Sequence, residues 1–360
     1  MAQFNPFKEN IRSLSAKGHR RAQWSSGIRL DRAEAPFPPS PEILGALQIW
    51  AAEGNRYPEP DCGTLRQAIA RYAVCSPTQV LVGSGSDELI DTIVRCCVNP
   101  GEEIVVPAPT FYFYQRSAQI HGGRVVIAKT TDSLDVMAEQ VLASISSATK
   151  VVFIANPNNP TGKLAAKDQI ESVIANCPCL VVIDECYFEF SGATVIDLID
   201  RYQNLIVLRS FSKAFGLAGM RLGYAIGNEM IIERLYTAMQ PFPVSGAAQA
   251  VGLAALGDLN YMRSNIQGVK RELARLTSGL EEIGFQVYPS HTNFVLANTF
   301  NTDVSASVIV DALNKSEIYI WDCTGTPGAG NNHVRITTGT PEQNDLLVAS
   351  LKNILERVSA

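Results

Sequence analysis

The sequence lacks the features that mark membrane, secreted and nucleic-acid-binding proteins. No apolar run approaches the roughly 20 residues that a membrane helix requires, and residues 1–21 lack the apolar core of a signal peptide. Charged residues make up only 18%, and the formal net charge of −5 argues against the basic surface that nucleic acids usually need. These absences predict a cytoplasmic protein with no membrane or nucleic-acid partner.

Histidines are scarce, and the spacing of a metal site is missing. The histidines are His19, His121, His291 and His333. They share no ligand spacing with the cysteines, which disfavours the common zinc patterns. Eight cysteines would suffice for disulfides, but Cys96 and Cys97 are adjacent and one residue separates Cys177 from Cys179. All four border apolar segments, so we expect reduced thiols in the protein interior.

Hydrophobic residues, by contrast, are plentiful: they make up 46% of 360 residues, enough to bury a large core. Between about Ser40 and Leu256, apolar strand-like runs alternate with helical stretches. This alternation predicts an α/β domain with a mostly parallel sheet covered on both faces. A long helical pattern and three more strand-like runs predict a smaller α+β domain at 257–360, with residues 1–39 packing against it as an N-terminal arm.

Small and polar residues follow the ends of the predicted strands, where open α/β sheets bind their ligands. A glycine-rich turn with Gly85, Ser86 and Asp87 opens a helix whose free N–H groups favour a phosphate. The later strand ends carry Phe111 in PAPTFYFY, Asn159 in NPNNPTG, Asp184 and Tyr187 in VVIDECY, and Ser210, Ser212, Lys213 and Arg221 in RSFSKAFGLAGMRLGY.

Each of these features has a structural explanation when it is judged alone. Many glycine turns bind nothing, the aromatic residues would pack in a core, and Lys213 could be a surface lysine. Together, however, they fit one ligand, pyridoxal phosphate, which has a phosphate, a flat ring with a basic nitrogen and an electrophilic carbon. Asp184 would pair with the ring nitrogen, since a carboxylate that ends an apolar strand needs a cation. Desolvation would lower the pKa of Lys213, and its free amine could then form a Schiff base.

Three motifs carry a family resemblance: NPNNPTG, DECY and SFSKAFGLAGMRLGY. They resemble the fold-type I pyridoxal-phosphate enzymes of the aspartate aminotransferase superfamily, and within it the histidinol-phosphate aminotransferases, over most of the chain. The resemblance implies a large domain with a mostly parallel seven-stranded sheet, a smaller α+β domain and a homodimer with shared active sites. It also implies an aminotransferase that acts on a small amino-acid substrate.

The resemblance further implies a role for each site residue. Lys213 would carry the cofactor and move the substrate proton, while Asp184 would keep the ring nitrogen protonated. Arg335 would bind the α-carboxylate of the substrate through two parallel hydrogen bonds. The remaining cofactor contacts would come from Gly85, Ser86, Asp87, Phe111, Asn159, Tyr187, Ser210, Ser212 and Arg221, with Tyr57 reaching the phosphate bound by the partner subunit.

The chain departs from the histidinol-phosphate pattern at substrate-facing positions. Ala33 and Ala35 replace two expected asparagines, and Trp321 replaces an expected arginine. An expected tyrosine falls near Lys17. These changes predict a substrate other than histidinol phosphate, unless Lys17, His19 or Arg20 does the work of the lost arginine.

The departures suggest how a different substrate would be bound and leave the reaction open. Glu9 would bind a cationic side chain such as guanidinium, and Trp321 would stack on that group or on an aromatic ring. A lyase or cyclase reaction is the alternative to amino-group transfer, because pyridoxal phosphate serves both. A regulator domain with this fold is disfavoured by the absence of a DNA-binding segment or basic patch. A Rossmann dehydrogenase is disfavoured because GSGSDE lacks the G-x-G-x-x-G spacing.

Overall fold

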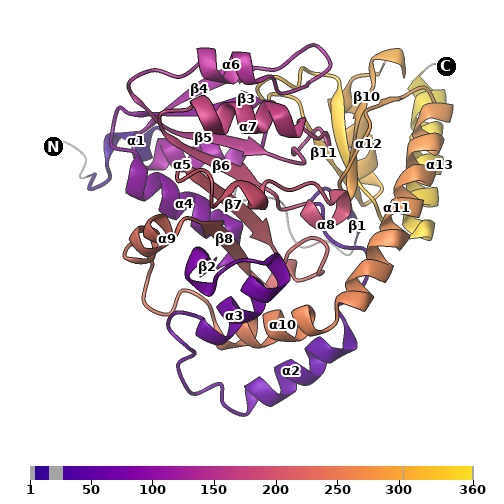
Figure 1. Ribbon diagram of the computed structural model, residues 1–360. Coiled ribbons are helices and arrows are strands. Elements are labelled where there is room, and N and C mark those ends of the chain that lie inside the picture. Colours follow the sequence, from indigo (N-terminus) through magenta and orange to yellow (C-terminus); the bar gives the residue numbers. More distant parts are fainter. Residues whose placement is uncertain (1–4, 16–26, 303, 359–360) are drawn as a thin grey trace.

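Two β-sheets with their covering helices make up the part of the chain that the computed structural model describes, residues 5–15, 27–302 and 304–358 (Figure 1). Lys17, His19 and Arg20, the predicted substitutes for the lost arginine, lie outside the described residues.

The larger sheet has seven strands, and only β8 runs antiparallel to its neighbours. In spatial order the strands are β2 (Val80–Gly83), β8 (Gly223–Gly227), β7 (Leu205–Ser210), β6 (Leu180–Asp184), β5 (Thr149–Ala155), β3 (Glu103–Ala108) and β4 (Arg124–Lys129). This arrangement confirms the predicted mostly parallel seven-stranded sheet.

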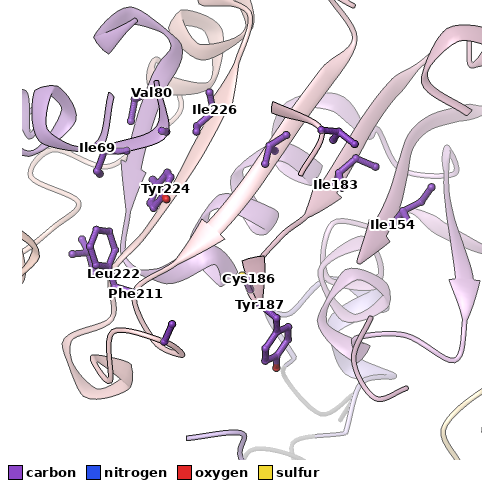
Figure 2. Packing of buried hydrophobic residues seen from close by; sticks show 14 of the residues in the cluster. Ile69, Val80, Ile154, Ile183, Cys186, Tyr187, Phe211, Leu222, Tyr224 and Ile226 are labelled. Atoms are coloured by element: carbon purple, nitrogen blue, oxygen red, sulfur yellow. The ribbon is translucent and has the colours of Figure 1, made fainter. Parts of the chain in front are cut away.

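Helices cover both faces of the larger sheet, which explains why its central strands are mostly apolar. In β6, Val182 packs into the core on one face, while Val181 and Ile183 pack into the core on the other. The first face is covered by α4 (Gly85–Cys97), α5 (Tyr112–Ile120) and α9 (Glu229–Tyr236). The second face, part of whose core is shown in Figure 2, is covered by α3 (Gly63–Ala73), α6 (Ala138–Ala143), α7 (Lys167–Asn176), α8 (Phe188–Ser191), α10 (Gly246–Gly257) and the start of α11 (Leu259–Glu282).

The smaller sheet has five strands and its own hydrophobic core. In spatial order they are β1 (Ile28–Leu30), β11 (Ile318–Asp322), β12 (His333–Thr337), β10 (Phe294–Asn298) and β9 (Gln286–Val287), and the covering helices are α12 (Ala306–Lys315) and α13 (Pro341–Val358). The long helix α11 joins the two parts: Met262 and Ile266 pack in the core of the larger sheet, and Leu276 and Leu280 pack in that of the smaller one (Figure 1).

The remaining elements lie at the chain start and in the connections. They are α1 (Glu9–Arg12), α2 (Pro41–Ala51), which packs on α10, and the short 3-10 helices η1 (Pro77–Gln79), η2 (Ile196–Leu198), η3 (Ala218–Met220) and η4 (Phe300–Thr302).

The predicted N-terminal arm divides between the two parts of the molecule. Strand β1 pairs in parallel with β11 and so belongs to the smaller sheet, where we expected the arm to pack. Helix α1 lies against α5 of the larger part instead, because the Asn10 side chain donates hydrogen bonds to the carbonyl oxygens of Gln119 (2.9 Å) and Ile120 (2.8 Å). The expected packing of the arm therefore needs correction at α1.

A buried ion pair ties the end of β7 to the residue that follows β6. Arg209 donates to one carboxylate oxygen of Glu185 from Nε (3.0 Å) and Nη2 (2.9 Å), and the two side chains are 2% and 0% exposed. The other carboxylate oxygen of Glu185 accepts a hydrogen bond from the Val195 amide at 2.7 Å. Since these residues adjoin Ser210 and Asp184, the pair fixes the spacing of two strand ends that reach the candidate site.

We expect Glu185→Gln to lower the free energy of unfolding by about 3–5 kcal/mol, because it leaves a buried guanidinium without its anion. Urea unfolding measures the change. The matched control is Glu171→Gln, which breaks the exposed Arg201–Glu171 pair (2.6 Å) and should cost less than about 1 kcal/mol. Equal losses in the two variants would contradict this assignment.

Candidate active site

A cavity of about 410 Å³ lies at the carboxyl ends of the parallel strands of the larger sheet. This is the edge at which open α/β sheets bind ligands. The predicted residues that line it are Ser86, Asp87, Phe111, Asn159, Asp184, Tyr187, Ser210, Ser212, Lys213 and Arg221.

One end of the cavity is built to receive an anion. Helix α4 begins there at Gly85, so its first backbone N–H groups have no partner within the helix. Gly85 has a φ of +82°, and a Cβ atom added to it would lie 2.7 Å from Nη2 of Arg221. Only glycine therefore lets the guanidinium approach the helix start this closely. Arg221 itself has a φ of +50°, a strained conformation of the kind that clusters at functional sites.

Two hydroxyl groups line the cavity at the end of β7, from Ser210, its last residue, and from Ser212. The Ser212 amide donates to Oγ of Ser210 at 3.1 Å, and both serines are buried. Arg221 pairs with Asp87 across the helix start at 2.9 Å. Backbone N–H groups, serine hydroxyls and a guanidinium together are the donors that a phosphate requires.

Lys213 projects into the cavity because its neighbours in the chain are pulled into the core. Phe211, Ala214 and Phe215 are buried on the second face of the sheet. The Lys213 amine instead donates to the carbonyl oxygens of Arg32 (3.3 Å) and Ala33 (3.2 Å). Burial, and to a smaller extent the charge of Arg335, lowers the pKa of Lys213 to about 8. About a tenth of the amine is therefore neutral and nucleophilic at pH 7, far more than for an ordinary lysine.

Asp184 is a buried carboxylate that lacks a cationic side-chain partner among the described residues. Its oxygens accept hydrogen bonds from the Cys186 amide (3.0 Å) and the Tyr114 hydroxyl (2.6 Å). Burial raises the pKa of Asp184, and these two hydrogen bonds oppose that rise. An ionised carboxylate in such a place is costly unless a cation pairs with it. A protonated ring nitrogen in the cavity would meet this requirement.

Tyr114 is a positioning residue that the sequence did not reveal. Its ring is fully buried and stacks on Phe153, with centroids 4.8 Å apart. Phe111 lies one helical turn earlier and packs edge-on against the Tyr114 ring at 5.6 Å. Both rings come from PAPTFYFY, and nothing in this aromatic-rich segment distinguishes Tyr114 from its neighbours. The sequence could not show that one of them reaches Asp184.

We expect Tyr114→Phe to raise the pKa of Asp184 further, since the lost hydrogen bond stabilises the charged carboxylate. The protonated carboxyl group would then persist to higher pH, and binding of a cationic ring would weaken first on the acidic side. A charge-assisted hydrogen bond of this kind contributes about 1.5–3 kcal/mol, so roughly a 10- to 100-fold loss of cofactor affinity is expected. The affinity is measured by titrating the cofactor-free protein with pyridoxal phosphate between pH 5 and 9.

A matched control for this variant lies on the opposite face of the sheet. The Tyr72 hydroxyl donates to the Glu189 carboxylate at 3.2 Å, outside the cavity. Tyr72→Phe should therefore leave cofactor affinity unchanged at every pH. An equal effect of the two variants would show that Tyr114 acts only through stability.

Arg335 lies behind the cavity wall and reaches it through Asn159. It donates from Nη1 to Oδ1 of Asn159 at 2.6 Å and from Nη2 to the carbonyl oxygen of Asp31. Its Nε is buried without a hydrogen-bond partner, and buried polar atoms of this kind call for an explanation. A carboxylate bound beside Asn159 would supply the missing acceptor.

Several predicted residues do not line the cavity. Trp321 is the antiparallel partner of Arg335 in the smaller sheet and lies 5.3 Å from its guanidinium, and its stacking on substrate stays a prediction. Tyr57 is 82% exposed and stacks on Phe242 at 4.6 Å. Glu9 is exposed on α1, away from the cavity of its own chain, because α1 is held against the end of α5.

Other cavity residues escaped the sequence analysis. Arg32 and Glu34 line it because the connection after β1 is fixed to the smaller part of the molecule. The Ala33 amide donates to the Thr337 hydroxyl at 2.9 Å, and the Asn293 side chain donates to the carbonyl oxygens of Ala33 (3.1 Å) and Glu34 (3.2 Å). Glu34 lies between Ala33 and Ala35, and no sequence pattern marks it as a cavity residue.

The described residues were also compared with the requirements of a metal site and of a membrane-spanning helix. They contain no group of three or more His, Cys, Asp or Glu side chains placed to hold a metal ion. Within the same ranges, no helix has both the length and the apolar character needed to span a membrane.

Known proteins with similar sequences identify the family of this chain. Residues 25–351 match the family described as "Aminotransferase class I and II". The chain is 35% identical to the histidinol-phosphate aminotransferase of Methanosarcina barkeri, over 99% of this chain and 96% of the relative. It is 39% identical to that of Roseiflexus castenholzii, over 91% and 89%.

A solved structure extends the agreement to three dimensions. The histidinol-phosphate aminotransferase of Sinorhizobium meliloti, in complex with pyridoxal-5′-phosphate, superimposes with a TM-score of 0.90 at 28% identity, covering 99% of both chains. The sequence motifs, the two-sheet fold and the match over most of the chain lead to one conclusion. The protein belongs to the aminotransferase class I and II family.

Proposed function

We propose that the protein is a pyridoxal-phosphate-dependent aminotransferase that transfers the α-amino group of an amino acid, as a relative of the histidinol-phosphate aminotransferases. The observation that carries this proposal is the pairing, in one cavity, of a low-pKa lysine with a buried carboxylate that lacks a cation. Lys213 and Asp184 approach the cavity from neighbouring strand ends, and the anion site at α4 lies beside them. Pyridoxal phosphate fits all three groups. Its aldehyde would react with Lys213, its pyridine nitrogen would pair with Asp184, and its phosphate would bind at the start of α4.

The residues of the cavity divide the cofactor among them. The α4 start, Ser210, Ser212 and Arg221 would hold the phosphate. Asp184 would pair with the ring nitrogen, Phe111 would stack on the ring, and Asn159 and Tyr187 would bind the ring oxygen. The Tyr187 hydroxyl is suited to that contact because it remains protonated: burial raises its pKa above the ordinary value.

Bound pyridoxal phosphate supplies an electron-accepting ring that stabilises negative charge at the substrate Cα. The side chains of the protein would transfer the Cα proton and orient the cofactor and the substrate. The Lys213 amine would remove the proton from the substrate Cα, a task for which a base with a pKa near the working pH is best suited. Asp184, oriented by Tyr114 and the Cys186 amide, would stabilise positive charge on the ring nitrogen.

Arg335 is proposed to recognise the carboxylate of the amino-acid substrate. Its guanidinium lies near the aromatic rings of Phe294 (5.1 Å) and Trp321 (5.3 Å), and these contacts help to position it. We expect Arg335→Lys to raise KM for amino donors by roughly 10- to 100-fold, since an ammonium group cannot make two parallel hydrogen bonds. Initial-rate kinetics measure the effect, and Arg263→Lys on the exposed side of α11 is the control. An unchanged KM would remove Arg335 from the substrate site.

A lyase or cyclase reaction is the second candidate, and the replaced substrate-facing residues favour it. Ala33 and Ala35 offer no side-chain hydrogen bond, and Trp321 covers Arg335 where the related enzymes are expected to have an arginine. The same Lys213 and Asp184 would support loss of a group from the substrate side chain or of carbon dioxide.

A single-turnover experiment separates the two candidates. The holoprotein is mixed with one amino acid at a time, or with histidinol phosphate, and no keto acid is added. Amino transfer predicts one equivalent of oxo product per site and a cofactor that keeps the amino group until a keto acid is supplied. Release of ammonia, water or carbon dioxide in repeated turnovers would establish the lyase or cyclase reaction instead.

We also propose that two copies of the chain share their active sites. Tyr57 points into solvent on a single chain although it is a large aromatic residue, and Phe242, on which it stacks, has a φ of +54°. In a homodimer, Tyr57 would complete the phosphate site of the other copy.

A further inference from the structure

Two thiols lie against each other at the edge of the larger sheet that is opposite the active site. Cys177 follows α7, Cys179 precedes β6, and their sulfur atoms are 3.3 Å apart. A disulfide bond is about 2.05 Å long, so the sulfur atoms need to approach by only about 1.2 Å. No part of the proposed catalytic chemistry uses either residue.

The fold fixes the backbone that carries both thiols. The Asn204 side-chain amide donates hydrogen bonds to the carbonyl oxygens of Ile174 (3.1 Å), Cys177 (3.2 Å) and Cys179 (3.2 Å). The Cys177 amide donates to the carbonyl oxygen of Val173 at 2.9 Å, which closes the last turn of α7. Cys177 and Cys179 are therefore held as neighbours by contacts from the next segment of the chain.

The pair is also chemically distinct from the other cysteines. The hydrogen bond between the two thiols lowers the pKa of Cys177 and raises that of Cys179, so the pair can hold one thiolate. Lys150 is close enough to favour negative charge on Cys179. Burial instead raises the pKa of Cys62 to about 12 and that of Cys97 to about 11. The thiolate, not the thiol, is the nucleophile that attacks an oxidant.

We propose that Cys177 and Cys179 form a redox-active dithiol that closes to a disulfide on reaction with a peroxide. The Cys177 thiolate attacks one oxygen of hydrogen peroxide, the O–O bond breaks, and a sulfenic acid and hydroxide form. The Cys179 thiol then attacks the sulfenic sulfur, the S–O bond breaks, and water leaves as the S–S bond forms. In total, two thiols and one peroxide give one disulfide and two waters, and two electrons pass from sulfur to oxygen.

The disulfide is expected to be reversible. A ring closed across a single intervening residue, Pro178, is short, and strained disulfides are the more easily reduced ones. Two molecules of a small thiol such as glutathione would reopen it and leave as one glutathione disulfide. The pair thus responds to the balance of peroxide and thiol around the protein.

This site is separate from the active site. Cys179 precedes the first residue of β6, and Asp184 is its last residue. At about 3.3 Å per residue, the pair lies on the order of 15 Å from the carboxylate, with the packed core between them. The redox reaction of Cys177 and Cys179 therefore does not depend on which reaction the active site catalyses.

The test uses the holoprotein, reduced and freed of thiol reagent, then treated with increasing equivalents of hydrogen peroxide. Remaining thiols are alkylated and mapped by mass spectrometry. Cys177 and Cys179 should lose their thiols together, with a mass lower by two hydrogens, at least about 10-fold faster than Cys96 or Cys97. Dithiothreitol should restore both. Oxidation of Cys96 and Cys97 first, or oxygen addition at Cys177 without a disulfide, would overturn the proposal.

The variant Cys179→Ser supplies a mechanistic check. Without the second thiol, the oxidation should stop at a sulfenic acid on Cys177 that a cyclic diketone such as dimedone traps. The wild-type protein should give little of this adduct, because Cys179 consumes the sulfenic acid. Equal trapping in the two proteins would mean that the thiols do not react with each other. Because thiol mapping of the wild type needs no variant, the proposal remains testable if Cys179→Ser folds poorly.

Discussion

Replacing Asp184 with asparagine is expected to lower kcat/KM by roughly 10²- to 10⁴-fold, the rate equivalent of losing about 3–5 kcal/mol for one partner of a buried charge pair. Asparagine has the same shape and can still accept a hydrogen bond from the Cys186 amide or the Tyr114 hydroxyl. It carries no negative charge, however, so the ring nitrogen would lose its proton and with it most of its capacity to accept electrons. Steady-state kinetics with saturating pyridoxal phosphate measure the loss.

A control distinguishes this electrostatic effect from a general loss of structure. Asp168→Asn changes an acidic residue in the first turn of α7, outside the cavity, and should leave kcat/KM within about twofold, as surface substitutions usually do. The Asp184→Asn protein should melt cooperatively, since burial already opposes the charge that the substitution removes. Activity within tenfold of the wild type would mean that Asp184 does not hold the ring nitrogen.

The second large effect is expected for Lys213→Ala, which should abolish covalent attachment of the cofactor. It should also lower kcat by at least roughly 10²- to 10⁴-fold, the usual contribution of a positioned general base. The variant retains the phosphate site and Asp184, so it should still bind pyridoxal phosphate without a covalent bond. Rapid-quench kinetics and mass spectrometry after borohydride reduction measure the two effects.

Lys167→Ala is the matched control for this variant. Lys167 is an exposed lysine that pairs with Asp197 at 2.7 Å, outside the cavity. Its removal should change neither attachment nor kcat. If Lys213→Ala retained covalent cofactor, another lysine would be the site of attachment.

The fold was predictable because the central strands of the larger sheet are mostly apolar. Runs such as KVVFIA and LVVID are buried on both faces, as Val181, Val182 and Ile183 show in β6. A continuous apolar strand followed by a helix has few stable arrangements other than a parallel sheet between helix layers. The position of α1 was not predictable in this way, because it depends on Asn10 donating to the carbonyl oxygens of Gln119 and Ile120 at the end of α5.

The candidate site was predictable where its residues follow strand ends. Asp184, Ser210 and Lys213 lie close in sequence to the strands that position them, so the topology alone brings them together. Contacts between distant segments were not predictable. The hydrogen bond from Tyr114 to Asp184 depends on the orientation of α5, and the contact of Lys213 with the Ala33 carbonyl depends on the connection after β1.

The contacts of the substrate-facing residues were even less predictable from the sequence. The expected arginine at Trp321 and the expected asparagines at Ala33 and Ala35 were recognised as missing from the sequence. Only the structure shows that Trp321 covers the Arg335 guanidinium and that Glu34 faces the cavity. Such placements depend on the direction of single side chains in a packed core, which neither periodicity nor spacing determines.

The central claim is that Lys213 is the residue that binds pyridoxal phosphate. The most direct test is to add pyridoxal phosphate to the cofactor-free protein, reduce with borohydride, digest and map the adduct. We predict one adduct per chain, on Lys213. Its rate of formation should rise with pH until about pH 8 and then level off, because the neutral amine is the nucleophile. An adduct spread over surface lysines, or none on Lys213, would contradict the account.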